Sequence, residues 1–377
     1  MHILLRALGA AAPTTAFVAM AACGSSGDGG GAVATGDGGG ASGASSSGEG
    51  GHGDGPAVLP DGAPVVDAGH DASLFDAPPP VGDGRVTLHL PDGKWHRVAA
   101  KVGGADQDLS TAMSVVSPGD DNFLGMSKDG DWIVSNSGRF ACVTGSCLDL
   151  FAGALGSGSE VKPAGNSVQL ADARPVVAAG GGVIVYAAKG GPHTVDLYAV
   201  KKSGAAWSAP LLLTGASSFA YHHDAAIAPD GSRVVFDCGA DLYAQPPTSM
   251  CEVATDGTGF QEVLSPSDGP DHGASHALHH PDYTPEGDFV FEADWPSEQI
   301  WKLPRGTKAA VKLSAATETD DNSPCVLPDG RVASLWLNRP GNSGNAHELK
   351  VMGPAGGGSV MVLTGQDITD IGISCGN

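Results

Sequence analysis

Short apolar runs alternate with tight polar turns along much of the chain, and the pattern returns about every fifty residues from roughly residue 111 onward. Its clearest marker is a leucine followed by a hydroxyl residue at the end of a run. The copies lie 51, 49 and 50 residues apart, at Leu213-Thr214, Leu264-Ser265, Leu313-Ser314 and Leu363-Thr364. So regular a repeat predicts a stack or ring of similar units, because one unit alone cannot bury its apolar face.

Each unit also carries a turn followed by a strand. In Pro229-Asp230-Gly231 the proline presets φ and the glycine permits a positive φ, and the β-branched and aromatic run Val234-Val235-Phe236 follows. Comparable turns stand at Lys128-Asp129-Gly130, Gly180-Gly181-Gly182, Pro285-Glu286-Gly287 and Pro328-Asp329-Gly330. With a third apolar run and the outer run that ends in leucine, each unit is predicted to be a four-stranded antiparallel meander, the blade of a β-propeller.

One of these units is specific enough to compare with a family. The stretch from Ala228 to Phe236, with Asp256-Gly257-Thr258-Gly259 after it, resembles the repeat of TolB-like propellers, a WD40-like repeat of the PD40 type. The resemblance covers about residues 111–377 and implies six blades.

The two ends of this region lack partners of their own. We predict that the hairpin 86–98 and the strand 370–375 share one blade, which closes the ring and hides its edges. The predicted fold is therefore an all-β, six-bladed propeller of four-stranded antiparallel blades over residues 85–377.

The first residues have the features of a bacterial export signal. Arg6 supplies a positive charge, and the mostly small and apolar residues after it end in Ala21-Ala22-Cys23, which resembles a lipobox. Residues 1–22 are thus predicted to be a signal peptide, and Cys23 to carry a lipid. The alternative is an ordinary secreted protein cleaved near Ala22.

A linker is predicted to follow. Residues 23–84 consist mainly of Gly, Ala, Ser, Asp and Pro and contain no Lys or Arg, so they offer little apolar surface to offset the entropy lost on ordering. We expect a disordered tether that holds the propeller away from a membrane. Gly24 after the cysteine favours the outer membrane, by analogy with other bacterial lipoproteins, with the propeller facing the periplasm or the cell surface.

The charge balance narrows the classes of partner. Lysine and arginine total 20 against 42 aspartates and glutamates, a net charge of −22. Binding of nucleic acid is disfavoured, because it requires Lys and Arg to neutralise phosphates. No basic patch for anionic lipid is visible, so contact with the membrane is expected only through the lipid anchor.

Six cysteines remain besides Cys23, and an even number in an exported chain predicts disulfides. One pair flanks a Val-Thr-Gly-Ser turn, one pair joins the end of one strand to the start of the next, and the last pair would join the final two repeats. The predicted bridges are Cys142–Cys147, Cys238–Cys251 and Cys325–Cys375. Free buried thiols are the alternative.

A column of polar residues stands at the entrance of the innermost strands. Each lies seven residues before the acidic position of a turn or its counterpart, and together they are predicted to ring one mouth of the central channel. They are Asn122, Arg174, His223, His279 and Asn322.

Histidines are concentrated in two neighbouring blades. Imidazole together with carboxylate suits Zn²⁺, Mn²⁺ and similar divalent metals. The candidate ligands are His223, His279, His276, His280 and Asp224. The competing interpretation is structural, because polar residues at the start of an inner strand can cap loops or bond to the neighbouring blade.

Two functions follow from these observations. The resemblance to TolB-like propellers implies a monomeric, non-catalytic binding or scaffold module for a protein partner or a saccharide. The rival is a metal-dependent lyase or hydrolase, because oligogalacturonate lyases are propellers of similar build with a histidine-coordinated metal. The feature that separates them is whether a third ligand converges on His223 and His279; His276, His280 and Asp224 are the candidates.

Overall fold

The computed structural model describes most of the chain beyond residue 82. The described residues are 83–109, 121–137, 150–155, 157–165, 168–170, 174–240, 248–273, 275–315, 318–337, 339, 346–369 and 372–377. The predicted signal peptide, Cys23 and nearly all of the predicted linker lie outside them, as do Cys142 and Cys147. Regular structure within the described residues is almost entirely β-strand.

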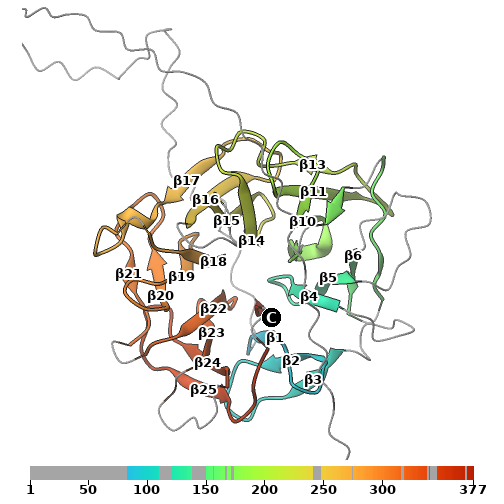
Figure 1. Cartoon of the computed structure of the whole chain (residues 1–377). Coiled ribbons are helices and arrows are strands. Elements are labelled where there is room, and N and C mark those ends of the chain that lie inside the picture. Colours follow the sequence, from blue (N-terminus) through green and yellow to red (C-terminus); the bar gives the residue numbers. More distant parts are fainter. Residues whose placement is uncertain are drawn as a thin grey trace, which may run out of the picture. The chain divides into compact units, whose positions relative to one another are not determined.

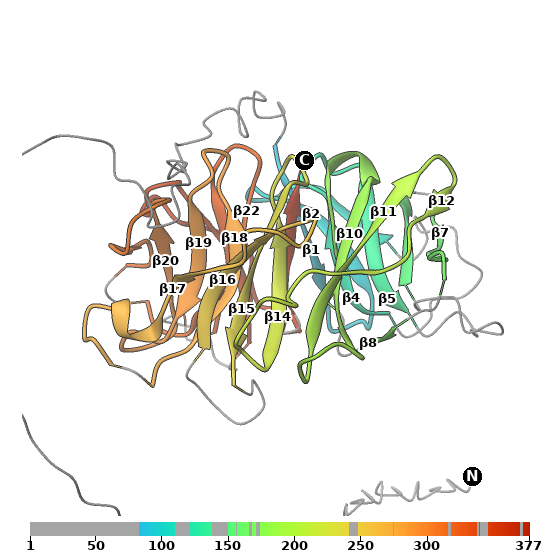
Figure 2. The same ribbon diagram turned by 90° about the horizontal axis from the view of Figure 1, so that it is seen from above.

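The strands form six sheets arranged as a ring of blades around a central axis (Figure 1). Figure 2 shows the strands running along the ring axis between two faces of loops. Four of the sheets are plain antiparallel meanders. These are β4 (Asp121–Met126), β5 (Trp132–Ser137), β6 (Leu150–Ala154) and β7 (Ser159–Glu160); β14 (Tyr221–Ile227), β15 (Arg233–Gly239), β16 (Thr248–Ala254) and β17 (Gln261–Leu264); β18 (Leu278–Tyr283), β19 (Phe289–Ala293), β20 (Gln299–Leu303) and β21 (Val311–Lys312); and β22 (Asp321–Val326), β23 (Val332–Trp336), β24 (Glu348–Met352) and β25 (Val360–Leu363).

The blade where the sequence repeat is least regular has the same antiparallel arrangement, but two short strands replace one strand at each of its edges. Its two central strands are β10 (Val183–Lys189) and β11 (Asp196–Ser203). The inner position is divided between β8 (Gln169–Leu170) and β9 (Val176–Val177), which both pair with β10. The outer position is divided between β12 (Ala206–Trp207) and β13 (Leu211–Leu212), which both pair with β11.

The sixth blade joins the two ends of the propeller. Its strand order is β26 (Ser374–Gly376), β1 (Arg85–His89), β2 (Trp95–Ala99) and β3 (Asp106–Asp108), so the last strand in the sequence is the innermost one. The predicted six-bladed ring and its closure by both ends are confirmed.

Two of the three predicted disulfides are present. Cys238–Cys251 joins the adjacent strands β15 and β16, with Cα atoms 6.0 Å apart. Cys325–Cys375 joins β22 to β26 across two blades, with Cα atoms 5.5 Å apart. Both separations lie in the usual range for a disulfide. The predicted bridge Cys142–Cys147 lies outside the described residues.

The sequence markers have definite structural roles. Gly231 adopts a φ of +74°, which closes its turn so that its N–H donates to the Ala228 carbonyl at 2.8 Å. Leu213, Leu264 and Leu313 of the Leu-hydroxyl pairs are buried, and in two of these pairs the hydroxyl neighbour ties the outer strand to the third strand. The Ile300 N–H donates to Ser314 Oγ at 2.8 Å, and Thr214 Oγ1 accepts from a backbone N–H in the same way.

The core lies between the blades. One apolar cluster packs Val235 of one blade against Phe289 and Trp301 of the next, and another packs Val86 and Leu88 of the closing blade against Leu335 and Leu349 of its neighbour. Each blade therefore buries its faces only against its two neighbours, which is why the ring must close.

Candidate functional site

The innermost strands share an irregularity near the start of the channel. The strand register shifts by a bulge between His223 and Ala226, between His279 and Asp282, and between Asn322 and Cys325. At each of these three bulges one residue has backbone angles in the left-handed region, and so does Arg174, just before β9. Their φ values are +26° for Arg174, +44° for Asp224, +47° for His280 and +48° for Ser323.

These four residues occupy equivalent positions, seven residues before the turn glycines 181, 231, 287 and 330. A residue other than glycine rarely adopts a positive φ, and each instance costs roughly 1 kcal/mol or more. Four neighbouring blades thus hold a strained polar residue at one level of the channel.

The residues predicted to ring the channel mouth belong to two adjacent positions of the repeat rather than to one. Gly181 donates its N–H to the Ala178 carbonyl, as Gly231 does in its own turn, so Arg174 is the counterpart of Asp224 rather than of His223. His223, His279 and Asn322 each stand one residue before the residue with positive φ in their strand. The side chain of Asn122 lies outside the described part of the structure.

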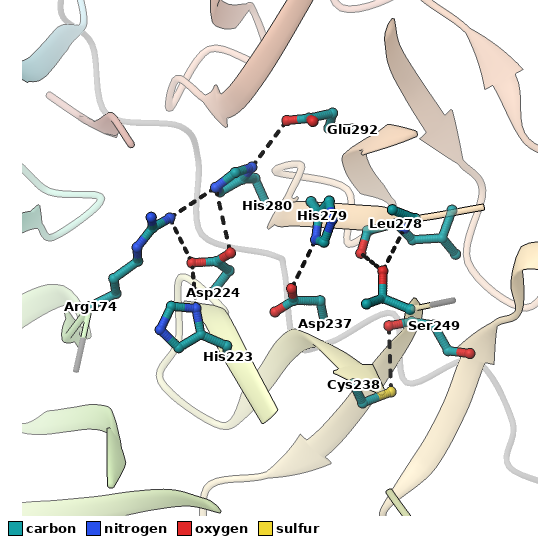
Figure 3. A network of polar contacts seen from close by, with 12 residues as sticks. Arg174, His223, Asp224, Asp237, Cys238, Ser249, Leu278, His279, His280 and Glu292 are labelled. Atoms are coloured by element: carbon teal, nitrogen blue, oxygen red, sulfur yellow. Dashed lines mark hydrogen bonds and ion pairs between the residues drawn. The ribbon is translucent and has the colours of Figure 1, made fainter. Parts of the chain in front are cut away.

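Side chains from three blades meet at this level (Figure 3). Arg174 Nη1 lies 2.8 Å from Asp224 Oδ1 and 2.9 Å from His280 Nε2. His223 Nδ1 lies 2.9 Å from the same oxygen of Asp224. We call this group, with the acids described next, the channel cluster; it comprises Arg174, His223, Asp224, Asp237, His279, His280 and Glu292.

Two acids of the second strands complete the channel cluster. Asp237 of β15 is the cross-strand partner of His223, and Glu292 of β19 is the partner of His279. His279 Nδ1 lies 3.0 Å from Asp237 Oδ2, and His280 Nδ1 lies 3.0 Å from Glu292 Oε2. The sequence analysis missed both acids; the available signal was an acid directly after a buried apolar run, Val-Val-Phe in one blade and Phe-Val-Phe in the next.

The cluster shifts the pKa values of its members. Although burial lowers the pKa of His223, the carboxylates of Asp224 and Asp237 outweigh it and raise that pKa to about 9. Burial likewise opposes ionisation of His279, yet its contact with Asp237 raises the pKa to about 9. Burial alone would raise the pKa of Asp224, but Arg174 and the histidines hold it well below its usual range.

A cavity of about 70 Å³ lies on the axis next to the cluster. Its polar lining includes Arg174, Asp224, His280, Asp282 and Ser323. The charges in this lining are paired within the protein: Lys128 Nζ, also in the wall, lies 2.5 Å from Asp282 Oδ2. The space suffices for a few water molecules or a small side chain.

His276 lies apart from these contacts. Its Nδ1 is 2.9 Å from Asp294 Oδ1 and its Nε2 is 2.7 Å from Asp271 Oδ2, both partly exposed carboxylates. Of the five predicted metal ligands, the structure brings His223 and Asp224 together and places His279 and His280 beside them.

A second group of histidine and aspartate lies between two blades. It comprises His193, Asp196 and His222 and is called the inter-blade cluster below. His222 Nδ1 donates to the Val195 carbonyl at 2.8 Å, and its Nε2 lies 2.8 Å from Ser217 Oγ. Burial lowers the pKa of His222 to about 4, so the ring is neutral.

Asp196 and His193 are equally engaged. Asp196 Oδ1 lies 2.6 Å from His193 Nδ1 and accepts from Thr214 Oγ1 at 2.6 Å. His193 Nε2 lies 3.1 Å from the Ser217 carbonyl. Each ring nitrogen of this cluster therefore already faces a protein partner.

One short motif escaped the sequence analysis. The residues Gly372-Ile373-Ser374-Cys375-Gly376 fit the spacing Gly-x-Ser-x-Gly of a hydrolase nucleophile. Ser374 lies in β26 rather than between a strand and a helix, and its hydroxyl is hydrogen-bonded to the backbone of Met126. The motif is thus part of the closing blade.

Comparison with known proteins agrees with this architecture. No protein-family model and no curated protein matches the sequence. Among solved structures, TolB from Acinetobacter baumannii superposes with a TM-score of 0.53 at 14% identity, over 78% of this chain and 67% of that one. Hydrazine synthase of Kuenenia stuttgartiensis gives 0.51 at 12% identity, over 80% and 48%. A puromycin-hydrolysing peptidase of Mycobacterium tuberculosis gives 0.47 at 16% identity, over 79% and 46%.

Fold and site together define a six-bladed β-propeller with a polar cluster built into its channel. Within that class its fold is similar to that of TolB. Identities this low establish the fold and leave the function to the site. In the part of the chain that the structure describes, no helix has the length and apolar character needed to cross a membrane.

Proposed function

We propose that this protein is a non-catalytic binding or scaffold module that receives a protein partner at the channel mouth, the end of the ring where His223 and His279 begin their strands. The observation that carries the proposal is the recurrence of Arg174, Asp224 and His280 on left-handed backbone around one cavity. Strain of this kind persists only where the surrounding structure enforces it, and it is concentrated at binding and catalytic sites.

A protein partner fits the cavity better than a saccharide does. Pockets for small organic ligands measure roughly 300–1,000 Å³, whereas this cavity measures about 70 Å³. One side chain of a partner can enter it, while the rest of the partner lies on the surrounding loops.

We further propose that the module is exported as a monomer and anchored to the outer membrane through lipidated Cys23, with residues 23–84 as the tether. The two disulfides support an oxidising compartment, because such bridges are rare in the cytosol of most cells. Replacing Cys23 by serine is expected to abolish labelling by radioactive palmitate and to release the protein from the membrane fraction. Unchanged labelling would contradict the anchor.

Partner binding can be tested by photo-crosslinking in the native host. A photoreactive phenylalanine analogue at Phe219, just before β14, probes the mouth. The matched control is Phe260, which is also partly buried against the same apolar cluster but lies at the opposite end of the blade, before β17.

A discrete crosslinked protein from position 219 alone, lost when Arg174 is replaced by alanine, is the expected result. Identical products from both positions, or none from position 219, would exclude the mouth as the binding face. A partner identified in this way can then be titrated against the purified full chain.

A further inference from the structure

We propose that His223, Asp224 and Asp237 bind a divalent first-row transition metal ion at the channel mouth. One potential ligand atom from each of the three lies within 4.8 Å of the others. The residues come from two neighbouring strands of one blade, β14 and β15, which fixes their spacing. The inference does not depend on the proposed protein partner.

Asp237 supplies the decisive observation. Its side chain is fully buried, and its Oδ2 is 3.0 Å from His279 Nδ1. Its Oδ1 is also buried but accepts no hydrogen bond from any residue that the structure describes. In Figure 3 this oxygen lies on the side of the carboxylate that faces His223. A buried carboxylate oxygen without a partner is costly, and a coordinated cation removes that cost.

The neighbouring side chains are placed to orient such ligands. His279 holds one oxygen of Asp237, which leaves the other for the metal, and Arg174 holds Asp224 at 2.8 Å. Contacts of this kind around a metal fix the direction of its ligands. The bulge at Asp224 gives the carboxylate a defined direction, because its backbone is confined to the left-handed region.

Coordination requires only that one pair of ligand atoms separates slightly and that the third ligand atom moves closer. Ligand atoms that share a tetrahedral Zn²⁺ are about 3.4 Å apart, given bonds of about 2.0–2.2 Å. His223 Nδ1 and Asp224 Oδ1 are already 2.9 Å apart. The metal would take the place of the proton between them and draw Asp237 inward.

The ligand types define the class of metal. One imidazole nitrogen and two carboxylate oxygens suit Zn²⁺, Mn²⁺, Fe²⁺ or Co²⁺, whereas Ca²⁺ and Mg²⁺ prefer sites made of oxygen alone. Three protein ligands leave at least one position for water or another ligand.

The test uses the purified full chain, stripped with a chelator and titrated with Zn²⁺, and with Co²⁺ for its absorption spectrum. We expect about one equivalent of bound Zn²⁺ and visible bands from bound Co²⁺. Asp237→Asn should weaken the affinity for Zn²⁺ at least ten-fold, because it removes one anionic ligand while keeping the side-chain shape.

Two controls keep the result interpretable. His193→Gln alters the inter-blade cluster and His276→Ala alters a surface histidine; both should bind Zn²⁺ as the unaltered chain does. The proposal fails if the folded, stripped chain binds no Zn²⁺, if folded Asp237→Asn binds it equally well, or if folded His193→Gln loses it. Metal binding is measured without a partner, so its failure is distinct from failure of the crosslinking experiment.

Discussion

Two clusters of histidine and aspartate share the strand β14 and differ in how completely their polar atoms are hydrogen-bonded. His222 and His223 are neighbours in β14, and since successive side chains point to opposite sides of a strand, each belongs to a different cluster. In the inter-blade cluster, as in His223, Asp224 and Asp237 of the channel cluster, the ligand atoms all lie within 4.8 Å of one another. Yet there the nitrogens of both histidines already face protein partners, whereas in the channel cluster Asp237 Oδ1 accepts no hydrogen bond from the residues that the structure describes.

The comparison shows that a set of ligand types at close range does not make a metal site. His222 donates to a backbone carbonyl and cannot also bind a metal through that nitrogen without breaking a buried hydrogen bond. Completeness of the hydrogen bonding separates a structural cluster from one that can accept an additional group.

The largest expected effect concerns the inter-blade cluster. Asp196→Ala leaves Thr214 and His193 without their acceptor in a buried site, so it should lower the free energy of unfolding by about 3–5 kcal/mol. Urea unfolding measures it. Thr214→Val is a milder substitute, expected to cost about 1–2 kcal/mol, if the first variant does not fold. Loss of Zn²⁺ binding in folded Thr214→Val, with stability intact, would show that the inter-blade cluster, and not the channel cluster, binds the metal.

The next effect is a pH dependence of opposite sign for the adjacent histidines in the metal-free chain. His222 has a folded pKa of about 4, below its unfolded value, so its contribution to stability falls as the pH drops from about 6.5 towards 4. His223 has a folded pKa of about 9, above its unfolded value, so its contribution is lost as the pH rises from about 6.5 towards 9. Each full change is on the order of 3 kcal/mol.

Nuclear magnetic resonance titration of the ring signals tests this directly. His222 should remain neutral and His223 protonated at pH 7. Two rings that titrate together near pH 6.5 would remove the electrostatic distinction between the clusters.

Zn²⁺ should stabilise the chain through the channel cluster only. At a free concentration one hundred times the dissociation constant, a single site raises the free energy of unfolding by about 2.7 kcal/mol. Thermal or urea unfolding with and without Zn²⁺ should show this gain in the unaltered chain and in His193→Gln, and a gain smaller by about 1.3 kcal/mol or more in Asp237→Asn. An equal gain in all three would place the metal elsewhere.

The smallest effect is expected at His276. Its ring lies between two partly exposed carboxylates, Asp271 and Asp294, and such surface pairs contribute about 0–1 kcal/mol. His276→Ala should therefore change urea unfolding by less than about 1 kcal/mol and leave Zn²⁺ affinity within about two-fold. A ten-fold loss of affinity would return His276 to the set of ligands.

The architecture was open to prediction from sequence because its determinants are local and repeated. Turns such as Pro229-Asp230-Gly231 and buried leucines such as Leu213 recur in several blades, and the two disulfides join positions that the repeat brings together. The broken edges around β8 and β13 were not predicted, because the repeat is degenerate there.

The site was harder to predict because it depends on bulges. An extra residue at Asp224 and His280 interrupts the alternation of a strand, so counting back from the turn gives a position that is correct only to within one residue. Asp237 and Glu292 enter from the second strand of the blade, and only the fold shows that this strand contributes to the channel.

Ring closure has a consequence for how the protein is made. The strand that completes the ring, β26, follows every other strand that the structure describes, and Cys375 reaches Cys325 only when that strand is in place. Until then five blades form an open arc with unsatisfied edges. Completion of the ring must therefore wait until the end of this region has been synthesised, and the open arc is prone to aggregation in the interval.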